Sequence, residues 1–174
     1  LKFSVGVSIN NLSLNENDLG DFKTFLKLSP PLRLENDRIG LVEGIKSGLI
    51  DVIVSDHTPE DEESKRLPFA QAATGAIGIE TLLPLALEMY HNESLTLSKI
   101  IETLTINPAK ILKIHKGTLK KGSEADICVF DLNKPWIVSA NNLKSKSKNS
   151  AIEGRKLQGK VFMTFLNGEL VFKS

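Results

Sequence analysis

The clearest pattern in the chain is an apolar, β-branched run at residues 50–54 that ends in a Ser-Asp-His-Thr-Pro turn. Such a run fits a buried strand. Pro59 ends this strand because proline has no N–H to donate to a neighbouring strand. Asp56 and His57 are therefore predicted at the C-terminal edge of the strand, where parallel α/β sheets and barrels place their chemistry. An acid there can ligate a metal, take a proton or cap the turn.

Strand and helix patterns also precede this run. Residues 2–9 are predicted as a strand, residues 12–18 as a polar turn, and the short apolar segment 22–28 as a second strand. Residues 35–47 are predicted as a helix that Gly48 ends in the C′ position. The apolar face of this helix is expected to hold Ile39, Val42 and Ile45 or Leu49. The order strand, strand, helix, strand with short connections indicates an α/β fold with a parallel sheet.

Helical patterns follow the central run. The connection at residues 57–80 is long, and long loops in compact domains are often functional. Residues 81–90 are apolar nearly all round, which predicts a deeply buried helix. Residues 97–104 keep helical spacing after Thr96, a suitable N-cap. Asn107-Pro108 is predicted to be the N-cap and first residue of a short helix that ends at Ile114.

The last third of the chain has the pattern of a small β module. Short β runs occupy residues 127–130, 136–138 and 160–166. Asn167-Gly168 lies between the last of these and another apolar run, which is a strong signal for a type I′ hairpin. The chain is thus predicted to be α/β first and β afterwards.

Composition limits the classes of function. The chain has 174 residues, of which 41% are hydrophobic and 25% charged, with a formal net charge of +1. These values are ordinary for a globular protein and give no electrostatic case for binding nucleic acid or a membrane surface. Cys128 is the single cysteine and is expected to be a small buried hydrophobe. No run reaches transmembrane length and no signal peptide opens the chain, so a cytoplasmic protein is expected. Because the chain starts at Leu1, we expect a piece of a longer protein.

Several motifs together carry a family resemblance. They are Ser29-Pro30-Pro31-Leu32-Arg33, Ser55-Asp56-His57-Thr58-Pro59, Gly75-Ala76-Ile77-Gly78, Asn107-Pro108-Ala109-Lys110, and Gly122-Ser123-Glu124-Ala125-Asp126. In order and spacing the chain resembles the C-terminal part of the dihydroorotases, which are metal-dependent amidohydrolases. The Pro-Pro-Leu-Arg and Asp-His-x-Pro motifs resemble this family and its near relatives, whereas the Asn-Pro-Ala and Gly-x-x-Ala-Asp motifs are shared more widely.

The resemblance implies a fold and a division into parts. Residues 1–115 would form the last strand–helix units of a (β/α)8 TIM-type barrel, and residues 116–174 part of a small β-domain. The family's His-x-His metal motif, its bridging lysine or aspartate and a substrate arginine lie earlier than this sequence. His57, His91 and His115 are not spaced as a metal site of their own. His91 and His115 are expected to have helix-end or solvated roles.

The resemblance also implies a role for Asp56. This residue matches the family's essential aspartate at the end of barrel strand eight, which touches the metal. It would take a proton from metal-bound water and pass it to the leaving amide nitrogen. Zinc is the metal implied for the complete protein, and this chain is expected to be inactive alone.

Three positions depart from the family pattern. The family's strand six ends in Pro-His-His-Leu, which supplies a metal histidine, but the matching segment here places Asn10 and Asn11 there. Asparagine is a weak, neutral ligand for zinc. Ser29 replaces an asparagine that resembles a substrate contact, and Glu60 replaces a histidine where an anionic substrate would approach. Ser29, Glu60 and Gly75 are nevertheless the expected substrate-binding positions.

Three functions follow from these motifs and departures. The first is a dihydroorotase-type hydrolase that interconverts N-carbamoyl-L-aspartate and dihydroorotate in pyrimidine biosynthesis. The second is a catalytically silent scaffold that holds aspartate transcarbamoylase, because barrel packing does not need the metal. The third is an allantoinase-like cyclic amidohydrolase. A small-molecule substrate and a homo-oligomer are expected.

The structural roles of several loop residues stay open at this point. Arg33 is either a buried clamp, which we favour, or a contact to a substrate carboxylate. Lys65 and Arg66 are expected to pair with nearby acids. Gly75 and Gly78 either let backbone N–H groups approach a ligand or permit a tight turn. The Lys-Ser-Lys-Ser-Lys run at 144–148 is expected to be a solvated face.

Overall fold

The computed structural model describes residue 1 and residues 3–174. Its α/β part is built on the strands β1 (Gly6–Ser8) and β2 (Val52–Val54), which pair in parallel with Gly6 opposite Val52. Helix α2 (Glu35–Ser47) is the crossover between them. The predicted parallel arrangement is confirmed, although β1 is shorter than the predicted strand, whose Lys2 lies outside the described residues.

The predicted second strand does not form. In its place the structure has α1 (Ile9–Ser13) and two short 3-10 helices, η1 (Glu16–Leu19) and η2 (Thr24–Leu26). Ser8 caps α1 through its hydroxyl, which accepts from the Asn10 N–H at 3.3 Å. The apolar residues of the 22–28 segment, such as Leu26 and Leu28, are buried as core contacts without a strand partner. An apolar run of this length is equally compatible with irregular buried backbone.

Helix α2 has the predicted bounds, and Gly48 ends it with φ 83° in the left-handed conformation. Its buried face is narrower than predicted. Val42 and Ile45 are buried, whereas Ile39 is 47% and Leu49 69% exposed. The helix therefore contacts the core along one narrow stripe. Ile39 and Leu49 lie outside this stripe, although both side chains are apolar.

Three helices follow the long connection, which itself contains the short helix α3 (Glu62–Arg66). Helix α4 (Leu82–His91) is buried as predicted. Helix α5 (Leu97–Leu104) is capped by Thr96, whose hydroxyl accepts from the Lys99 N–H, which confirms that cap. Helix α6 (Ile106–Leu112) begins one residue before Asn107-Pro108, so the predicted cap is wrong. The Asn107 amide instead donates to the Asp51 carbonyl at 2.9 Å, next to β2.

The C-terminal third forms an antiparallel sheet in the order β3–β4–β5. Strand β3 (Ile127–Ile137) joins the two predicted short runs through a bulge, β4 is Lys156–Leu166 and β5 is Glu169–Lys173. Asn167 and Gly168 both have positive φ, 51° and 84°, which confirms the predicted hairpin turn. Cys128 is exposed on β3, so its prediction as a buried residue is wrong: a three-stranded sheet covers only one face.

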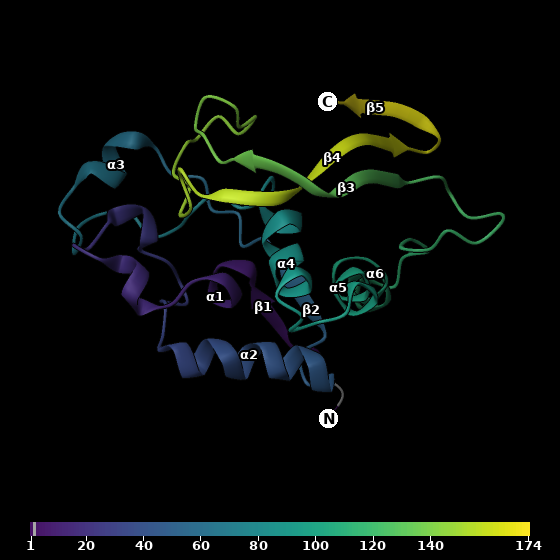
Figure 1. Ribbon diagram of the computed structural model, residues 1–174, viewed down its shortest axis with the longest axis horizontal. Helices are drawn as coiled ribbons and strands as arrows, with labels where there is room; N and C mark the ends of the chain where they lie inside the picture. Colours follow the sequence, from purple (N-terminus) through teal and green to yellow (C-terminus); the bar gives the residue numbers. More distant parts are fainter. Residues whose placement is uncertain (2) are drawn as a thin grey trace.

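Helix α4 lies between the β1–β2 pair and the C-terminal sheet (Figure 1). Its Leu87 packs so closely on β4 that a Cβ at Gly159 would lie 2.5 Å from Leu87 Cδ1. One buried cluster includes Ile45, Leu85 and Leu157, and so crosses the predicted boundary after residue 115. The division into two domains stays a prediction.

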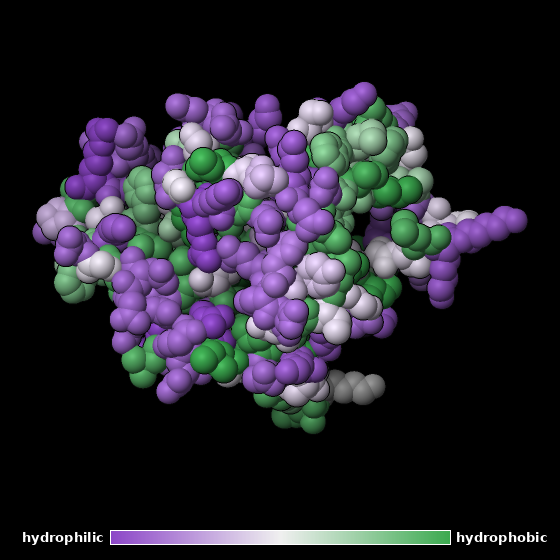
Figure 2. Space-filling view, in the orientation of Figure 1, coloured by the Kyte–Doolittle hydropathy of each residue, from purple (hydrophilic) through white to green (hydrophobic). Residues whose placement is uncertain are grey.

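Apolar side chains are also exposed along the C-terminal hairpin. Leu166, Leu170 and Val171 are each at least half exposed. Figure 2 shows a green area over β4 and β5. Across the part of the chain that the structure describes, no helix is long and apolar enough to cross a membrane.

The narrow buried stripe of α2 gives a matched pair of substitutions. Ile45 is fully buried, so Ile45→Ala should lower the free energy of unfolding by about 2–5 kcal/mol. Ile39→Ala on the same helix should change it by no more than about 0.5 kcal/mol, because that side chain is largely exposed. Chemical denaturation of both variants measures the difference. Equal losses would contradict the orientation of α2.

Candidate active site

Strand β2 delivers Asp56 to the C-terminal edge of the parallel pair. The residue is half-buried and has φ 49°, in the left-handed region that aspartate tolerates better than most residues. No hydrogen bond from the described residues reaches its carboxylate, and only its backbone carbonyl is bound, by the Thr58 hydroxyl at 3.3 Å. The carboxylate is thus held by its backbone and is free to act on a ligand.

His57 is bound within the protein. Its Nδ1 accepts from the Gly78 N–H at 3.1 Å, so a neutral ring carries its proton on Nε2. A Cβ at Gly78 would lie 2.3 Å from the Ser55 carbonyl oxygen. Glycine is required here because the backbone after β2 runs directly against it. The Gly78 N–H is thus bound within the protein, which does not favour its predicted approach to a ligand.

Gly75 lies in an equally close contact. It has φ 137°, and a Cβ would lie 2.5 Å from Thr58 Cγ2. Its N–H donates to the Lys27 carbonyl at 2.9 Å, and its carbonyl accepts from Lys65 and Asn149. Both polar backbone groups of Gly75 therefore bind within the protein, and its role as a substrate contact stays a prediction.

The β1–β2 register places Asn10 and Asp56 at the same edge, since each lies two residues beyond the paired Ser8 and Val54. Asn10 is only 2% exposed, and its Nδ2 is buried without a hydrogen-bond partner among the residues described. Asn11 is half-buried and donates from Nδ2 to the Pro31 carbonyl at 3.2 Å. This bond joins the end of β1 to the Pro-Pro-Leu-Arg segment.

Strands β1 and β2 pair directly, and α1, η1, η2 and α2 lie between them in the chain. The apolar segment 22–28 does not contribute a strand to this pair. The match of the segment with Asn10 and Asn11 to the end of the family's strand six stays a prediction.

The other predicted substrate positions lie on the loops around this edge. Ser29 is exposed, and Glu60 is half-buried with its N–H donating to Asn149 Oδ1 at 3.3 Å. Arg33 is exposed, so its favoured role as a buried clamp is wrong. The Pro-Pro-Leu-Arg segment buries Leu32 instead and turns Arg33 outward.

Of the two basic residues predicted to pair with nearby acids, Arg66 does so and Lys65 does not. Arg66 pairs with Glu62 and Glu63, as expected for neighbours on a short helix. Lys65 is instead buried, and its ammonium donates to two backbone carbonyls. The 144–148 run is largely exposed, with Lys144 and Ser145 donating backbone N–H groups to the Glu80 carboxylate.

The donor set does not fit a zinc ion on its own. Within residue 1 and residues 3–174, no group of three or more His, Cys, Asp or Glu side chains is close enough to hold a metal. His91 bonds to the Leu132 carbonyl at 3.0 Å and joins α4 to β3, and His115 is exposed. Asp56 is a single carboxylate, whereas zinc sites in proteins use three or four protein ligands.

Asn149 and Lys27 are the residues that the sequence did not indicate. Asn149 contacts Thr58 across 91 positions of sequence, and Lys27 donates to the carbonyls of Ala70 and Ala72. Asn149 lies in no patterned segment or motif, and Lys27 lies in the predicted strand 22–28, whose pattern gave its side chain no role.

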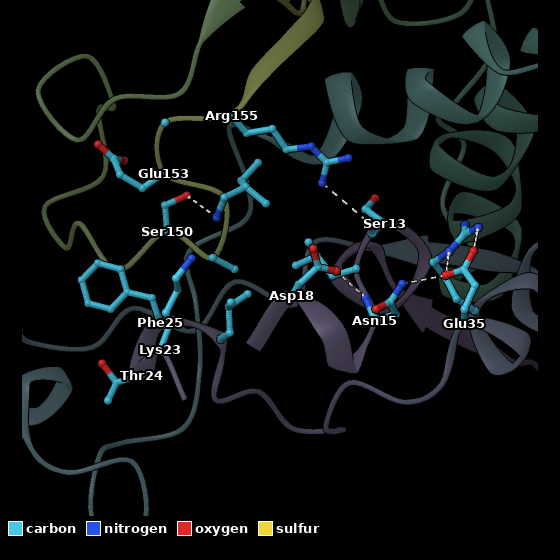
Figure 3. A pocket seen from close by; sticks show the side chains of 16 residues that line it. Ser13, Asn15, Asp18, Lys23, Thr24, Phe25, Glu35, Ser150, Glu153 and Arg155 are labelled. Atoms are coloured by element: carbon cyan, nitrogen blue, oxygen red, sulfur yellow. Dashed lines mark hydrogen bonds and ion pairs between the residues drawn. The ribbon is translucent and has the colours of Figure 1, made fainter. Parts of the chain in front are cut away.

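A polar groove of about 930 Å³ lies elsewhere and does not include Asp56 among its lining residues. It lies between the segment after α1 and residues 150–155 (Figure 3). Its two arginines are paired within the protein: Arg38 binds the Glu35 carboxylate at 2.6 Å, and Arg155 binds Glu88 at 3.0 Å. Hydrogen bonds from Arg38 and then from Asn15 lower the pKa of Glu35 to about 2.

Comparisons with known proteins agree with this architecture. The model of the amidohydrolase family matches residues 8–171. The dihydroorotase of Ehrlichia canis (strain Jake) is 44% identical over 172 residues, which are 99% of this chain and 38% of that protein. The dihydroorotase of Aquifex aeolicus (strain VF5) is 42% identical over 173 residues, which are 99% of this chain and 41% of that protein. The chain thus spans about two fifths of the length of these relatives.

A solved structure has the same arrangement. The L-hydantoinase (dihydropyrimidinase) from Arthrobacter aurescens superimposes with a TM-score of 0.91 and 31% identity. The match covers 98% of this chain and 39% of that one. The predicted fold class, the C-terminal portion of an α/β TIM-type barrel, is confirmed. The separate small β-domain stays a prediction.

The Asn10 amide nitrogen is buried without a partner among the described residues, so replacing it with an apolar group should stabilise the protein. Leucine has nearly the same shape and no polar group to satisfy, so Asn10→Leu should raise the free energy of unfolding by about 1 kcal/mol. Asn11→Leu should lower it by a similar amount, because the bond to Pro31 is lost. Denaturant titration of both variants measures this. A destabilised Asn10→Leu variant would show that the amide has a partner.

The lowered pKa of Glu35 predicts a pH dependence. The folded-state pKa of about 2 lies below the unfolded value of about 4.3. The Glu35–Arg38 pair therefore stabilises the fold fully at pH values above about 4.3. The stabilisation is lost as the pH falls toward 2. Glu35→Gln should therefore lower stability at pH 7, by at most about 1 kcal/mol for so exposed a pair. Thermal unfolding of both proteins should converge at acidic pH, and a constant offset down to pH 2 would be contrary to this.

Proposed function

The chain belongs to the amidohydrolase family, and from this premise we propose that the complete protein is a dihydroorotase-type cyclic amide hydrolase. It would interconvert N-carbamoyl-L-aspartate and dihydroorotate, a reaction of pyrimidine biosynthesis. The identity to dihydroorotases over nearly the whole of this chain supports the substrate class. We also retain the cytoplasmic location and the homo-oligomer expected from the sequence.

One observation carries the catalytic part of the proposal. The Asp56 carboxylate stands at the C-terminal edge of β2, and no hydrogen bond from the described part of the chain reaches it. A carboxylate in that position can take a proton from an attacking water molecule and pass it to the leaving amide nitrogen. Asp56 is therefore the proposed catalytic residue.

The loops around Asp56 supply the proposed substrate contacts. Ser29 is exposed and Glu60 half-buried, and both are accessible to a ligand at this edge. Gly75 would contribute through shape, because its N–H and carbonyl are bound within the protein. The exposed Arg33 is a fourth candidate, since a guanidinium can hold a substrate carboxylate by two hydrogen bonds.

Amidohydrolases generally use a metal, and zinc in the complete protein is part of the proposal. Asp56 is the proposed ligand from this chain. Asn10 and Asn11 do not suit zinc, because one amide is buried and the other is bound to Pro31. The other ligands would have to come from outside residues 1–174, and we expect this chain alone to be inactive.

Two alternatives remain. A catalytically silent scaffold for aspartate transcarbamoylase is favoured by the asparagines at 10 and 11 and by the lack of a metal-binding cluster in the part described. An allantoinase-like hydrolase has the same fold but another cyclic amide as substrate. A His-x-His motif in the preceding sequence would favour hydrolysis over the scaffold, and comparison of dihydroorotate with allantoin as substrates separates the two hydrolases.

Substitution of Asp56 tests the catalytic role in the complete protein. Asp56→Asn keeps the shape and the tolerance of positive φ but removes the charge, so kcat for dihydroorotate hydrolysis should fall by about 10²–10⁴-fold. Asp61→Asn in the same connection is the control, since asparagine also caps a helix and activity should be retained. Equal turnover of wild type and Asp56→Asn would remove Asp56 from the mechanism. Co-purification with transcarbamoylase activity but no hydrolysis would favour the scaffold.

A further inference from the structure

The connection between β2 and α4 is held by one side chain from the far end of the sequence. Asn149, in the connection between β3 and β4, is only 3% exposed. Its Nδ2 donates to the Thr58 carbonyl at 3.1 Å and to the Gly75 carbonyl at 3.2 Å. Its Oδ1 accepts from the Glu60 N–H at 3.3 Å. The Asn149 carboxamide therefore uses both donor hydrogens and its acceptor oxygen. It joins residues 58–60 to residues 75–77, which are here called the two arms of the connection.

The backbone of Asn149 adds a fourth bond. Its carbonyl accepts from the Ile77 N–H at 3.2 Å, and the neighbouring Ser150 pairs in parallel with Ile77. An isolated parallel β-bridge between Ile77 and Ser150 thus holds the segment around Asn149 beside residues 75–77.

Lys65 holds the same carbonyl from the other side. It is 1% exposed, and its ammonium donates to the carbonyls of Ala73 at 2.8 Å and Gly75 at 2.9 Å. Burial lowers the pKa of Lys65, and the Glu60 carboxylate partly opposes this. The Gly75 carbonyl is thereby fixed by two donors, one from each part of the chain.

Thr58, which Asn149 binds, lies two residues after Asp56 in the chain. Thr58 donates its N–H to the Ala76 carbonyl at 2.9 Å and its hydroxyl to the Asp56 carbonyl at 3.3 Å. A positive φ at a non-glycine residue persists when its surroundings fix it. The arms that Asn149 joins are the surroundings that fix Asp56.

We propose that Asn149 is a positioning residue of the active site, which holds Thr58 and Gly75 together so that the Asp56 carboxylate keeps its place at the edge of β2. The proposal rests on the proposed function for its catalytic consequence. A carboxylate that moves by about 1 Å loses up to about 100-fold in rate. The C-terminal third of the chain therefore completes the site without touching the substrate.

The side chain at 149 has to supply two donors and one acceptor at fixed distances. Asn149→Asp keeps the shape and the acceptor for Glu60, but leaves the carbonyls of Thr58 and Gly75 without this donor. Asn141→Asp is the matched control, because Asn141 is exposed in the same connection. Both changes add one negative charge, but only Asn149→Asp removes the two hydrogen bonds that join the arms of the connection.

The kinetic test uses the complete protein and dihydroorotate. Asn149→Asp should lower kcat by about 10–100-fold with KM changed less than about threefold, since positioning acts on the reacting group and not on uniform binding. Asn141→Asp should match the wild type. A folded Asn149→Asp protein with wild-type kcat would overturn the proposal. If the variant is not recovered folded, Asn149→Gln, which moves the amide by one methylene, takes its place.

Hydrogen exchange separates this proposal from the proposed function. In Asn149→Asp the amides of Thr58 and Ile77 should exchange at least about tenfold faster, with those of α2 unchanged. If the wild type does not hydrolyse dihydroorotate, the proposed function fails, and the exchange data still decide whether Asn149 holds the two arms. Unchanged exchange at these amides, or equal acceleration throughout the chain, would overturn the positioning role.

Discussion

The parallel register of β1 and β2 is the constraint on which the candidate site depends. It sets Ser8 opposite Val54, so the polar residues that follow both strands emerge at one edge. Asp51 fixes this register from the other end, because its carboxylate accepts from the Val5 N–H and its carbonyl accepts from the Asn107 amide. A slip of one residue would turn Ile53 outward and reverse the facing of the whole strand. The Asn-Pro motif of α6 thus contacts the residue before β2, at the end opposite Asp56.

The long connection after β2 illustrates how a polar segment becomes rigid without an apolar core of its own. Its carbonyls are bound by the side chains of Lys27, Lys65 and Asn149, and close glycine contacts leave no room for other residues at 75 and 78. Buried carbonyls without donors would each cost about 1–3 kcal/mol, so the three side chains are as necessary as apolar packing.

Local patterns predicted what depends on local physics. The bounds of α2, its glycine C-cap, the Thr96 cap and the Asn167-Gly168 turn all follow from neighbouring residues. The family motifs placed Asp56 at a strand end. One group of errors arises because the burial and the distant contacts of a residue are not determined by its neighbours in the sequence. Cys128 and Ile39 are apolar but exposed, Lys65 is charged but buried, and Asn149 contacts residues 91 positions away.

The choice between enzyme and scaffold turns on what each would need from this edge. A scaffold needs a packed core and a surface, and neither requires Asp56 in a left-handed conformation with its carboxylate unbonded by the described residues. Strained backbone at a polar residue costs about 1–3 kcal/mol and persists where surrounding structure fixes it. Here the Thr58 hydroxyl binds the Asp56 carbonyl and the Thr58 N–H binds the Ala76 carbonyl, while no hydrogen bond from the described residues reaches the carboxylate. The asparagines at 10 and 11 weaken the case for metal ligands at the end of β1, but they do not touch this arrangement. We therefore favour hydrolysis, with Asp56 as the proton-transfer group, over the scaffold function.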